Sequence, residues 1–590
     1  MTTDRTALSR RGFGALAAGA GASLALAASA QARPGRDDAK AVEEILAGMS
    51  IEQKIGQMFV AVGYGSRVDQ AHKSNTETTG VATIAEIIRT HHVGGLIYFS
   101  WSDNLEDCQQ VASLSDGAQK VALDADGIPL LISTDEERGV VSRLPAPATE
   151  LPGSMGLGAT GSRWHARACA KLTAKELRVC GIAQAFAPIV DVNVDARNPV
   201  IGVRSFGADP ETVSRLAVAQ VKAFQREGVA STVKHFPGHG DTAVDSHVGL
   251  PEIDHSREEL ERLDLPPFRA AIDAGVDSIM TAHILVPALD DSGRPATLSR
   301  PILTGLLREE LGYDGVIVTD SLAMEGVRTL FKDDRVPVEA ILAGADQMLM
   351  PPNLTTAING VRKAVKAGEI TEERLDASVR RILTLKAKRG LLEDPYSRPD
   401  RIEAVVGSRH HRWMARTAAD DAVTLISKEG DALPLRRGRR VLVTGAGGDS
   451  SEILAGYLRN LRIQAEHFPI KKVTAESAKQ AAARAADYDA VITLTSSGAF
   501  ETPAEQVALV KAVVATGVPT VHVSLRNPYD VVHVGPVDAS IAAYAYTDCS
   551  LRAVARLAAG RMLASGKLPV AIPTADGKGE AFPIGRGLCR

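Results

Sequence analysis

The chain has 590 residues, which is more than a single ordinary hydrophobic core accommodates and indicates two or three domains. Its 67 basic and 71 acidic residues leave a formal net charge of -4, so no excess of positive charge favours nucleic acid or an anionic membrane as the partner. A hydrophobic content of 45% is typical of a soluble, well-packed protein, and a small neutral or weakly charged substrate fits this composition best.

The first 32 residues have the features of an export signal. Ser9-Arg10-Arg11-Gly12-Phe13 has the twin-arginine form, an Ala/Gly-rich apolar stretch follows, and Ala30-Gln31-Ala32 has the small-x-small pattern of a cleavage site. A membrane anchor is the alternative, but the many Ala and Gly residues make the stretch only weakly hydrophobic. We therefore expect cleavage after Ala32, no stable membrane insertion, and a protein that is secreted or located in the periplasm or cell wall.

Short apolar runs rich in β-branched residues recur along the first half of the chain, and a segment of helical length follows each run. This alternation is typical of parallel βαβ units. Eight runs are predicted as strands: 57–62, 95–99, 130–134, 184–190, 230–233, 278–282, 316–319 and 347–350. We therefore expect an α/β protein in which residues 40–395 form a (β/α)8 TIM-like barrel.

Polar residues stand at or just past the carboxyl ends of five of these runs. They are Asp135, Asp191, Lys234, His283 and Asp320. Because the carboxyl ends of barrel strands meet at one rim, these side chains are expected to face a common pocket. A single acid at a strand end is usually a helix cap or solvated, so the inference depends on the five residues together.

One segment after the run 230–233 concentrates ionisable groups. It reads Lys234-His235-Phe236-Pro237-Gly238-His239-Gly240-Asp241 and is continued by Asp245-Ser246-His247. A buried core would not accept so many ionisable side chains, since each one buried without a partner costs several kcal/mol. The Pro-Gly pair breaks a helix and gives the backbone freedom to approach a ligand. We therefore predict a functional loop here.

A metal site is the main alternative for this loop, because His235 and His239 have the i, i+4 spacing of a helical zinc pair. Pro237 and Gly238 disfavour a helix between them, and the Glu of an H-E-x-x-H motif is missing, so no metal is expected. The chain has no G-x-S-x-G motif for a serine nucleophile. Its five cysteines are widely spaced without a C-x-x-C pair, and we expect buried free thiols.

Asp320 follows an apolar run in Gly315-Val316-Ile317-Val318-Thr319-Asp320, which delivers a carboxylate to the predicted rim. It could act as a nucleophile or, equally, cap the next helix. Asp245 is two residues from His247 and could fix the tautomer of that imidazole and stabilise its protonated form. His247 could then donate and recover a proton near neutral pH.

The second half of the chain shows a different pattern after Leu391. Residues 396–420, which contain His410 and His411, indicate a linker and a connecting helix, and a second domain is predicted over 421–590. Its predicted strands alternate with Ala-rich helical stretches, which favours a smaller open α/β sandwich. These strands are 441–444, 490–495, 520–524 and 540–546.

A glycine-rich turn, Gly445-Ala446-Gly447-Gly448, follows the first of these strands. Ser451 stands where the third glycine of a dinucleotide-binding fingerprint belongs. We therefore interpret the turn as a tight strand-to-helix connection and expect no cofactor.

Taken together, these motifs resemble the β-N-acetylglucosaminidase branch of family-3 glycoside hydrolases, and the resemblance covers nearly all of the chain after the signal. The resembling segments are Lys234-His235-Phe236-Pro237-Gly238-His239-Gly240 with Asp245-Ser246-His247, Val318-Thr319-Asp320-Ser321-Leu322, Asn198-Pro199-Val200-Ile201-Gly202-Val203-Arg204-Ser205-Phe206-Gly207, Met280-Thr281-Ala282-His283 and Gly566-Lys567-Leu568-Pro569-Val570.

The resemblance implies a retaining double displacement without a cofactor. Asp320 matches the nucleophile of the family, and His247, held by Asp245, matches its acid/base. The residues that match the family's sugar-binding positions are Asp135, Arg143, Arg204, Lys234 and His235. One position departs from the family pattern: Arg138 stands where the family usually has a glycine, and a Gly-specific conformation would strain a residue that carries a Cβ.

These matches predict a secreted exo-acting β-N-acetylhexosaminidase that removes terminal N-acetylglucosamine from an amino-sugar glycan or a muropeptide. Three alternatives stay open. A family-3 β-glucosidase generally takes its acid/base carboxylate from the second domain, a phosphorylase would exploit an uncharged histidine that repels phosphate less, and a non-enzymatic cell-wall-binding protein would have lost turnover. The sequence does not indicate an oligomeric state.

Overall fold

Eight parallel strands form the first sheet of the computed structural model, which describes residues 36–242 and 249–589. The strands follow one another in the order β7-β6-β5-β4-β3-β2-β1-β8, and a bridge between Val318 and Gln347 joins the two ends of the sheet. The strands are β1 (Phe59–Val62), β2 (Gly95–Ile97), β3 (Leu131–Thr134), β4 (Gln184–Ala185), β5 (Ala230–Phe236), β6 (Ser278–Thr281), β7 (Val316–Val318) and β8 (Met348–Leu349). The predicted TIM-like barrel is confirmed.

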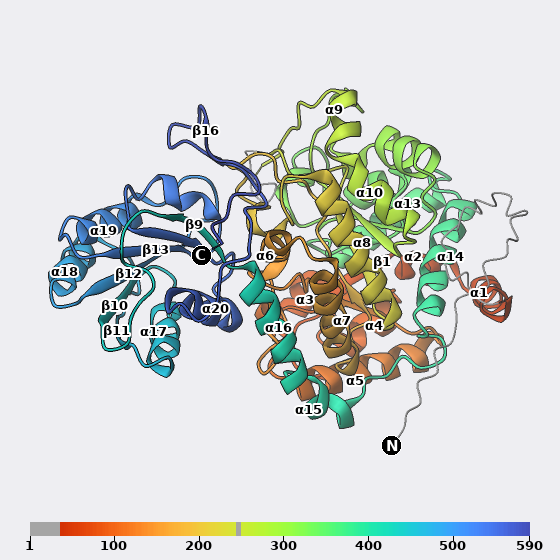
Figure 1. Cartoon of the computed structure of the whole chain (residues 1–590). Coiled ribbons are helices and arrows are strands. Elements are labelled where there is room, and N and C mark those ends of the chain that lie inside the picture. The colour runs from red at the N-terminus through yellow and green to blue at the C-terminus, as the bar shows by residue number, and fades with distance from the viewer. Residues whose placement is uncertain (1–35, 243–248, 590) are drawn as a thin grey trace, which may run out of the picture.

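Helices surround this barrel and connect its strands (Figure 1). They are α1 (Arg36–Gly48), α2 (Ile51–Gln57), α3 (Lys73–Thr79), α4 (Ile84–His91), α5 (Cys108–Asp126), α6 (Gly153–Thr160), α7 (Arg163–Val179), α8 (Pro210–Arg226), α9 (Arg257–Arg262), α10 (Leu265–Asp273), the π-helix Pro301–Glu310, α11 (Glu325–Arg328), α12 (Val336–Ala343), α13 (Leu354–Lys366) and α14 (Glu372–Lys388). Parallel strands need such crossovers, and in a closed barrel these helices cover the outer face of the sheet.

Several predicted strand boundaries differ from the structure, and two of these differences have identifiable reasons. The first strand begins at Phe59 and not at residue 57, because Ser50 and Gln53 form a capping box that starts helix α2. The fourth strand ends at Ala185 and does not reach residue 190, because Pro188 has no backbone N–H to donate. Ile189 then pairs with Lys234 as an isolated bridge, so the chain remains beside β5 up to Asp191.

The barrel interior is filled by a small apolar cluster that five strands contribute to. Its members are Val60, Ile97, Phe99, Phe186, Met280, Val318 and Leu349. The outward-facing strand residues pack with the helices in a separate, much larger core. Since the interior is a packed core without a pore, polar side chains concentrate at the carboxyl rim.

A six-stranded mixed sheet forms the second domain, with strand order β11-β10-β12-β13-β14-β9. The strands are β9 (Thr424–Lys428), β10 (Arg440–Gly445), β11 (Gln464–Phe468), β12 (Ala490–Thr495), β13 (Thr520–Ser524) and β14 (Ala539–Ala542). Helices α18 (Ala475–Ala485) and α19 (Ala504–Val514) pack on one face, and α17 (Ser450–Asn460) and α20 (Asp548–Ala558) pack on the other. The predicted α/β sandwich is confirmed.

Two strands of this sheet are absent from the prediction. β9 pairs antiparallel to β14 at one edge, and β11 lies at the other edge. The glycine-rich segment 445–448 is indeed a strand-to-helix turn, because β10 ends at Gly445 and α17 begins at Ser450. Gly445 has a φ of 124°, and a Cβ there would meet the carbonyl oxygen of Leu494 at 2.2 Å, so a glycine is required.

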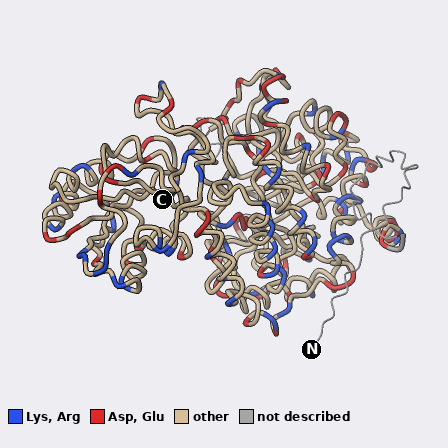
Figure 2. The backbone as a smooth tube through the Cα atoms, viewed as in Figure 1, with Lys and Arg blue, Asp and Glu red and all other residues tan. Residues whose placement is uncertain are grey.

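The helix α16 (Arg409–Ala422) lies between the two domains (Figure 1). It contacts α6 and α7 of the barrel and α20 of the second domain. A short helical turn, Pro399–Arg401, and α15 (Ile402–Val405) precede it, and the hairpin of β15 (Ile572–Pro573) and β16 (Glu580–Phe582) lies near the end of the chain. Figure 2 shows acidic and basic residues interspersed over both domains, as the small net charge suggests.

The predicted export signal lies outside the described residues, as does the predicted cleavage position after Ala32. Within residues 36–242 and 249–589, no helix combines the length and the apolar character that a bilayer crossing requires. Four cysteines are buried free thiols as predicted: Cys108, Cys169, Cys180 and Cys549. Cys589 is also a free thiol but is exposed, which the prediction missed.

A buried lysine on α14 leads to a prediction about stability. Lys386 is fully buried and donates to Oε1 of Gln57 at 2.7 Å. Burial lowers the pKa of Lys386 to about 7, against a small opposing effect of Asp126. The unfolded chain therefore binds more protons than the folded one between pH 7 and pH 10.5, and this residue makes the fold more stable as the pH rises through that range.

We expect Lys386→Met to stabilise the fold, because the variant removes a buried ammonium. The gain in unfolding free energy should be largest below pH 7 and should shrink by about 1.4 kcal/mol per pH unit above it. Urea unfolding of both proteins at pH 6, 8 and 9.5 measures this. Lys363→Met, at an exposed position of α13, is the control and should change stability little. A gain from Lys386→Met that is the same at pH 6 and pH 9.5 would contradict the account.

Candidate active site

Lys234, near the end of β5, lies at the centre of a buried cluster of charges. Its Nζ donates to Oδ1 of Asp135 at 2.8 Å and lies 2.7 Å from Oε1 of Glu137. Arg204 donates to both carboxylate oxygens of Glu137, at 2.9 and 2.8 Å. Three of the predicted sugar-binding residues are thus brought together around one acid that the sequence analysis did not single out.

Glu137 holds this cluster together. Burial alone raises the pKa of Glu137, but the charges of Arg204 and Lys234 and their hydrogen bonds outweigh it and hold the pKa well below its usual range. Burial lowers the pKa of Lys234, but the carboxylates of Asp135 and Glu137 outweigh burial and hold this pKa above its usual value. Glu137, Lys234 and Arg204 are therefore charged at neutral pH. In the sequence, the signal for Glu137 was the run of three acids Asp135-Glu136-Glu137 directly after a buried strand.

His235 is fixed by Asp191, which stands past the end of β4. Nδ1 of His235 is 2.7 Å from Oδ2 of Asp191, and the backbone N–H of His235 donates to Oδ1 at 3.0 Å. The backbone N–H of His239 donates to the same oxygen at 2.9 Å. A carboxylate bound to Nδ1 orients the ring and favours the tautomer with its proton on Nδ1. Asp191 is thus the residue that shapes the loop after β5.

Asp320 lies two residues past the end of β7 and is only partly buried. Its Oδ1 accepts from the backbone N–H of Ser321 at 2.7 Å, so the carboxylate is oriented by its own chain. Burial raises the pKa of Asp320, but the nearby His235, His283 and Lys234 and the Ser321 amide outweigh burial and hold the pKa below its ordinary value. Asp320 is therefore an ionised, partly accessible carboxylate within electrostatic range of Lys234 and His235.

His283, past the end of β6, supports the backbone next to Asp320. Its Nε2 is 2.9 Å from the carbonyl oxygen of Ser321, and its Nδ1 is 2.8 Å from Oγ1 of Thr297. The carboxyl ends of β3 to β7 therefore contribute Asp135, Asp191, Lys234, His283 and Asp320 to one region of the rim, as the sequence predicts.

Asp245 and His247, the predicted acid/base pair, lie outside the described residues. The chain immediately before them is fixed. Gly240 packs so tightly that a Cβ would meet the carbonyl oxygen of Val192 at 1.8 Å, and Oγ1 of Thr242 lies 2.8 Å from Nδ1 of His239. After them, His255 bridges Asp241 and Asp264, with both distances at 2.8 Å. The chain before residue 243 and the chain after residue 248 are thus linked through the bridge from Asp241 to His255.

Arg143 lies on the segment after β3, and Glu136 fixes its backbone. The N–H groups of Arg143 and Leu144 donate to Oε2 of Glu136 at 2.9 and 2.8 Å. The guanidinium of Arg143 lies over the ring of Phe99, 5.6 Å from its centroid. Nε of Arg143 is buried without a hydrogen-bond partner among the described residues. Arg143 is therefore placed on an aromatic face with donor capacity to spare.

Arg138 adopts the backbone conformation that the sequence analysis identified as a source of strain. Its φ is 67°, in the left-handed region that glycine prefers. The side chain is buried, and it donates to Oε2 of Glu176 at 2.8 Å and to Oγ1 of Thr173 at 3.1 Å. It also lies 3.4 Å from Oε1 of Glu136. These ion pairs offset the strained backbone and connect the Arg143 segment to helix α7.

The second domain supports the turn that carries Arg204. Nδ2 of Asn193 donates to the hydroxyl of Tyr529 at 3.1 Å, and Oδ1 of Asn193 accepts from the backbone N–H of Gly202 at 3.1 Å. Gly202 has a φ of 42°, and a Cβ there would come within 2.7 Å of Oδ1 of Asn527. Val203 packs in an apolar cluster that contains residues from both domains. The domain interface therefore fixes the position of Arg204.

The two histidines of the alternative metal site are not arranged as a helical zinc pair. His235 and His239 are not part of a helix, and their ring centroids lie 5.8 Å apart at an angle of 73°. Burial, together with His235, lowers the pKa of His239 to about 4, so this imidazole is neutral. No group of three His, Cys, Asp or Glu side chains within residues 36–242 and 249–589 is arranged to hold a metal ion.

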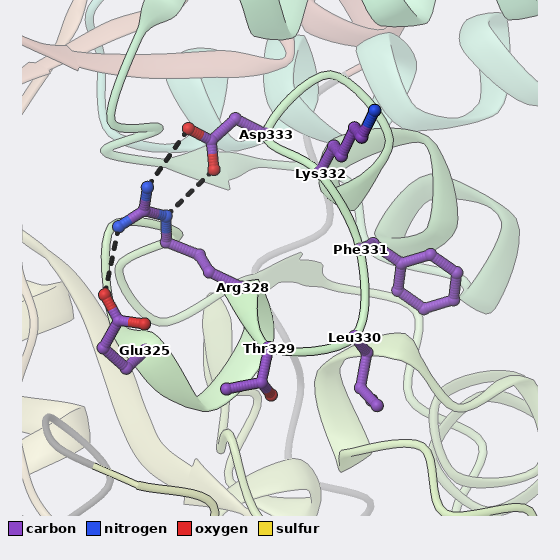
Figure 3. Close-up of a pocket in the computed structure, with 7 residues that line it drawn as sticks. All are labelled: Glu325, Arg328, Thr329, Leu330, Phe331, Lys332 and Asp333. Carbon is purple, nitrogen blue, oxygen red and sulfur yellow. Dashed lines mark hydrogen bonds and ion pairs between the residues drawn. The ribbon is translucent and has the colours of Figure 1, made fainter.

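The segment after Asp320 leads into a surface hollow of about 470 Å³. Figure 3 shows Arg328 between the carboxylates of Glu325 and Asp333, with Leu330 and Phe331 on the other side of the loop. The distances from Arg328 to these acids are 3.2 and 2.9 Å. Of the predicted site residues that the structure describes, none lines this hollow, so it is separate from the cluster around Lys234.

Fold and site together define a barrel enzyme with a centre of paired acidic and basic side chains at the carboxyl rim of its strands, where barrel enzymes carry out their chemistry. Two family models match the chain: the glycosyl hydrolase family 3 N terminal domain over residues 50–385, and the corresponding C-terminal domain over residues 423–586.

Individual relatives agree with this match. Beta-hexosaminidase A of Pseudoalteromonas piscicida is 35% identical over 554 residues, which span 84% of this chain and 92% of that protein. The beta-N-acetylglucosaminidase/beta-glucosidase of Cellulomonas fimi is 35% identical over 421 residues, or 69% of this chain and 70% of that one. The solved structure of a family 3 beta-N-acetylglucosaminidase from Paenibacillus sp. str. FPU-7 has a TM-score of 0.80 at 36% identity, and the match covers 89% of this chain and 99% of that one.

The chain belongs to glycoside hydrolase family 3, and it is a glycoside hydrolase.

Proposed function

We propose that the protein is a retaining, exo-acting β-N-acetylhexosaminidase that releases terminal β-linked N-acetylglucosamine. The relatives described as beta-hexosaminidase or beta-N-acetylglucosaminidase support this substrate class. The observation that carries the proposal is the position of Asp320. It is an ionised, partly accessible carboxylate on the rim that also carries Lys234 and His235.

In the first step, an oxygen of Asp320 attacks the anomeric carbon of the terminal sugar while the bond from that carbon to the glycosidic oxygen breaks. His247 donates a proton to the departing oxygen, so the leaving group departs as an alcohol. The low pKa of Asp320 keeps the nucleophile ionised, and its bond with the Ser321 amide keeps the carboxylate oriented.

In the second step, His247 takes a proton from a water molecule, whose oxygen attacks the anomeric carbon and releases Asp320. Two inversions return the β configuration. A neutral imidazole suits this second step, because it can act as a base near Asp320 without adding another negative charge. Asp245 orients the ring in this scheme and stabilises the imidazolium after proton transfer.

The cluster around Lys234 holds the terminal sugar in this proposal. Lys234, Arg204 and Arg143 are donors for hydroxyl and acetamido oxygens, and Asp135 is an acceptor for hydroxyl hydrogens. Because Lys234 and Arg204 are already charged and oriented by Glu137, little side-chain ordering remains when the sugar binds.

We expect Glu137→Gln to lower kcat/KM for an aryl β-N-acetylglucosaminide by about 100-fold or more. The reason is that Lys234 and Arg204 lose a buried partner, a change that typically costs about 3–5 kcal/mol. Steady-state kinetics measures the loss of kcat/KM, and a thermal melt measures the loss of stability. Asp195→Asn is the control, because it removes the partner of the exposed Arg197 on the same rim and should cost about 1 kcal/mol or less. Equal effects of the two substitutions would contradict the role of Glu137.

A β-glucosidase is the second candidate, since the relative from Cellulomonas fimi is described with both activities. The rates on 4-nitrophenyl β-N-acetylglucosaminide and on the matching β-glucoside test the proposal. A kcat/KM that is clearly higher for the acetamido sugar supports it, and the reverse would overturn it. Running the reaction in phosphate buffer and analysing products for sugar 1-phosphate tests the phosphorylase alternative.

Peptidoglycan fragments are the proposed natural substrate, and export by the twin-arginine signal is the proposed route to them. The support for export is the Ser9-Arg10-Arg11-Gly12-Phe13 motif with its apolar stretch and cleavage site. Cell fractionation of the producing organism, with and without Arg10→Lys and Arg11→Lys, tests it. The wild type should accumulate outside the cytoplasm and the double variant inside it.

A further inference from the structure

A row of aromatic side chains lies at the barrel mouth, beside the proposed sugar site. Trp101 stacks on Phe99 with ring centroids 4.7 Å apart and an interplanar angle of 21°. Tyr64 meets the indole at 5.7 Å and stacks on His72 at 5.2 Å. The other neighbour of Phe99 is the guanidinium of Arg143. The row therefore connects an exposed tryptophan directly to a proposed sugar-binding residue.

Trp101 is held rigidly although 54% of its surface is exposed. It belongs to the short 3-10 turn Ser100–Ser102, and the backbone N–H of Gly65 donates to the carbonyl oxygen of Ser102 at 2.9 Å. The buried side chain of Asn104 donates to the carbonyl oxygens of Gly63 and Gly65, both at 2.9 Å. These bonds tie the turn after β2 to the loop after β1. A large apolar ring that is exposed and yet fixed loses little entropy when a ligand covers it.

The indole borders a hollow of about 280 Å³ at the carboxyl ends of β1, β2 and β8. Tyr64, Met350 and Pro351 contribute to its mostly apolar wall, and Ala323 closes it on the side of the loop that carries Asp320. The hollow thus adjoins the proposed site: Ala323 in its wall is three residues from Asp320, and Trp101 stacks directly on Phe99, the ring that Arg143 covers.

The site has two regions that differ in solvent exposure, a buried charged region and an exposed aromatic region. Lys234 and Glu137 are almost completely buried, each with 3% of the side chain exposed, whereas Trp101 lies at the surface. In an exo-acting enzyme the terminal sugar occupies the closed, polar region, and the part of the substrate beyond the scissile bond leaves through the mouth. The C–H-rich face of a pyranose ring packs well on an aromatic face, and the polar edge of that sugar stays in water.

We propose that Trp101 and the adjoining hollow bind the sugar ring on the leaving-group side of the scissile bond, so that the enzyme prefers glycans over substrates with a small leaving group. This inference rests on the proposed function. It makes Trp101 a specificity-determining residue that acts on the leaving group and not on the terminal N-acetylglucosamine.

Two substrates separate the two regions of the site. The β-1,4-linked disaccharide of N-acetylglucosamine has a sugar leaving group, whereas N-acetyl-β-glucosaminyl fluoride has a single atom there. Trp101→Ala should lower kcat/KM for the disaccharide by about tenfold, as the loss of an aromatic contact does, and for the fluoride by less than about twofold. Trp101→Phe, which keeps an aromatic face, should recover much of the loss on the disaccharide.

Trp413→Ala provides the matched control. Trp413 is equally exposed, at 55%, and also stacks on a neighbouring ring, that of His410, but it lies on α16. Both substrates should be hydrolysed normally by this variant. Thermal melts establish that all three variants are folded.

The outcomes distinguish the two proposals. Equal losses of Trp101→Ala on the disaccharide and the fluoride would overturn the inference, because Trp101 would then act on the terminal sugar through Phe99 and Arg143. Unchanged rates on both substrates would also overturn it. A wild-type protein that hydrolyses neither substrate would instead show that the proposed function is wrong.

Discussion

Asp320→Ala is expected to reduce hydrolysis of an aryl β-N-acetylglucosaminide by at least about 10⁴-fold, since removal of a nucleophile eliminates the covalent route and leaves only binding and transition-state positioning. Azide added to the variant should restore turnover and give the α-linked glycosyl azide, because the small anion enters the space of the missing carboxylate and attacks from the same side. Kinetics with and without azide, with product stereochemistry by NMR, measure this.

Asp333→Ala is the matched control for Asp320→Ala. It removes a carboxylate from the loop after β7 that is paired with Arg328 at 2.9 Å and that lines the separate hollow. Its activity should remain within a few-fold of the wild type and should not respond to azide. If azide produces a β-linked product in Asp320→Ala, or no product at all, Asp320 is not the nucleophile.

His247→Ala should affect substrates according to their leaving group. General acid catalysis contributes about 10²–10⁴-fold, and it matters only where the departing oxygen needs a proton. We expect a loss of this size on the disaccharide of N-acetylglucosamine and a much smaller loss in the first step on a 2,4-dinitrophenyl glycoside, whose leaving group departs as an anion. Pre-steady-state kinetics on the activated substrate should then show a burst, because the second step still lacks its base.

Asp245→Asn tests whether the carboxylate acts through the histidine. It should lower activity on the disaccharide less than His247→Ala does and should shift the pH profile, since the imidazolium loses its stabilising partner. Uniform losses over all leaving groups in both variants would argue against an acid/base role.

The barrel could be predicted from the sequence because each strand is a short buried run followed by a helix, and because a buried parallel strand is apolar on both faces. The strand ends were predictable only where the local signals agree. Pro188 ends the β4 ladder inside an apolar run, and the capping box of Ser50 makes a helix of residues that read as a strand start. Edge strand β11 was missed because Ala465 is its one buried residue and Gln464 and Glu466 are exposed, which leaves almost no apolar run.

Within the site, the rim positions of Asp135, Lys234 and Asp320 were predictable, because the order of strands in a barrel fixes which chain segments meet. The partners of these residues were not. Glu137 and Asp191 are acids next to strand ends, and nothing in their local sequence indicates that one pairs with Arg204, which is 67 residues away, or the other with His235. Such pairs depend on side-chain directions that only the folded backbone determines.

Arg138 is an exception to the rule that a left-handed backbone position is occupied by glycine. The sequence raised only the condition that a Gly-specific conformation would strain this residue, and Arg138 does adopt a left-handed backbone, with a φ of 67°. The buried pairs with Glu176 and Glu136 offset a strain of about 1–3 kcal/mol and could not be inferred from the sequence.

The most direct test of the central claim, that Asp320 and the charged cluster around Lys234 serve one sugar, is to identify the residue labelled by a 2-acetamido-5-fluoro glycoside. After incubation with this inactivator, intact-mass and peptide mass spectrometry should find one added sugar per chain, attached as an ester to Asp320, and Glu137→Gln should be labelled far more slowly. A label on any other carboxylate, or equal labelling rates for wild type and Glu137→Gln, would contradict the account.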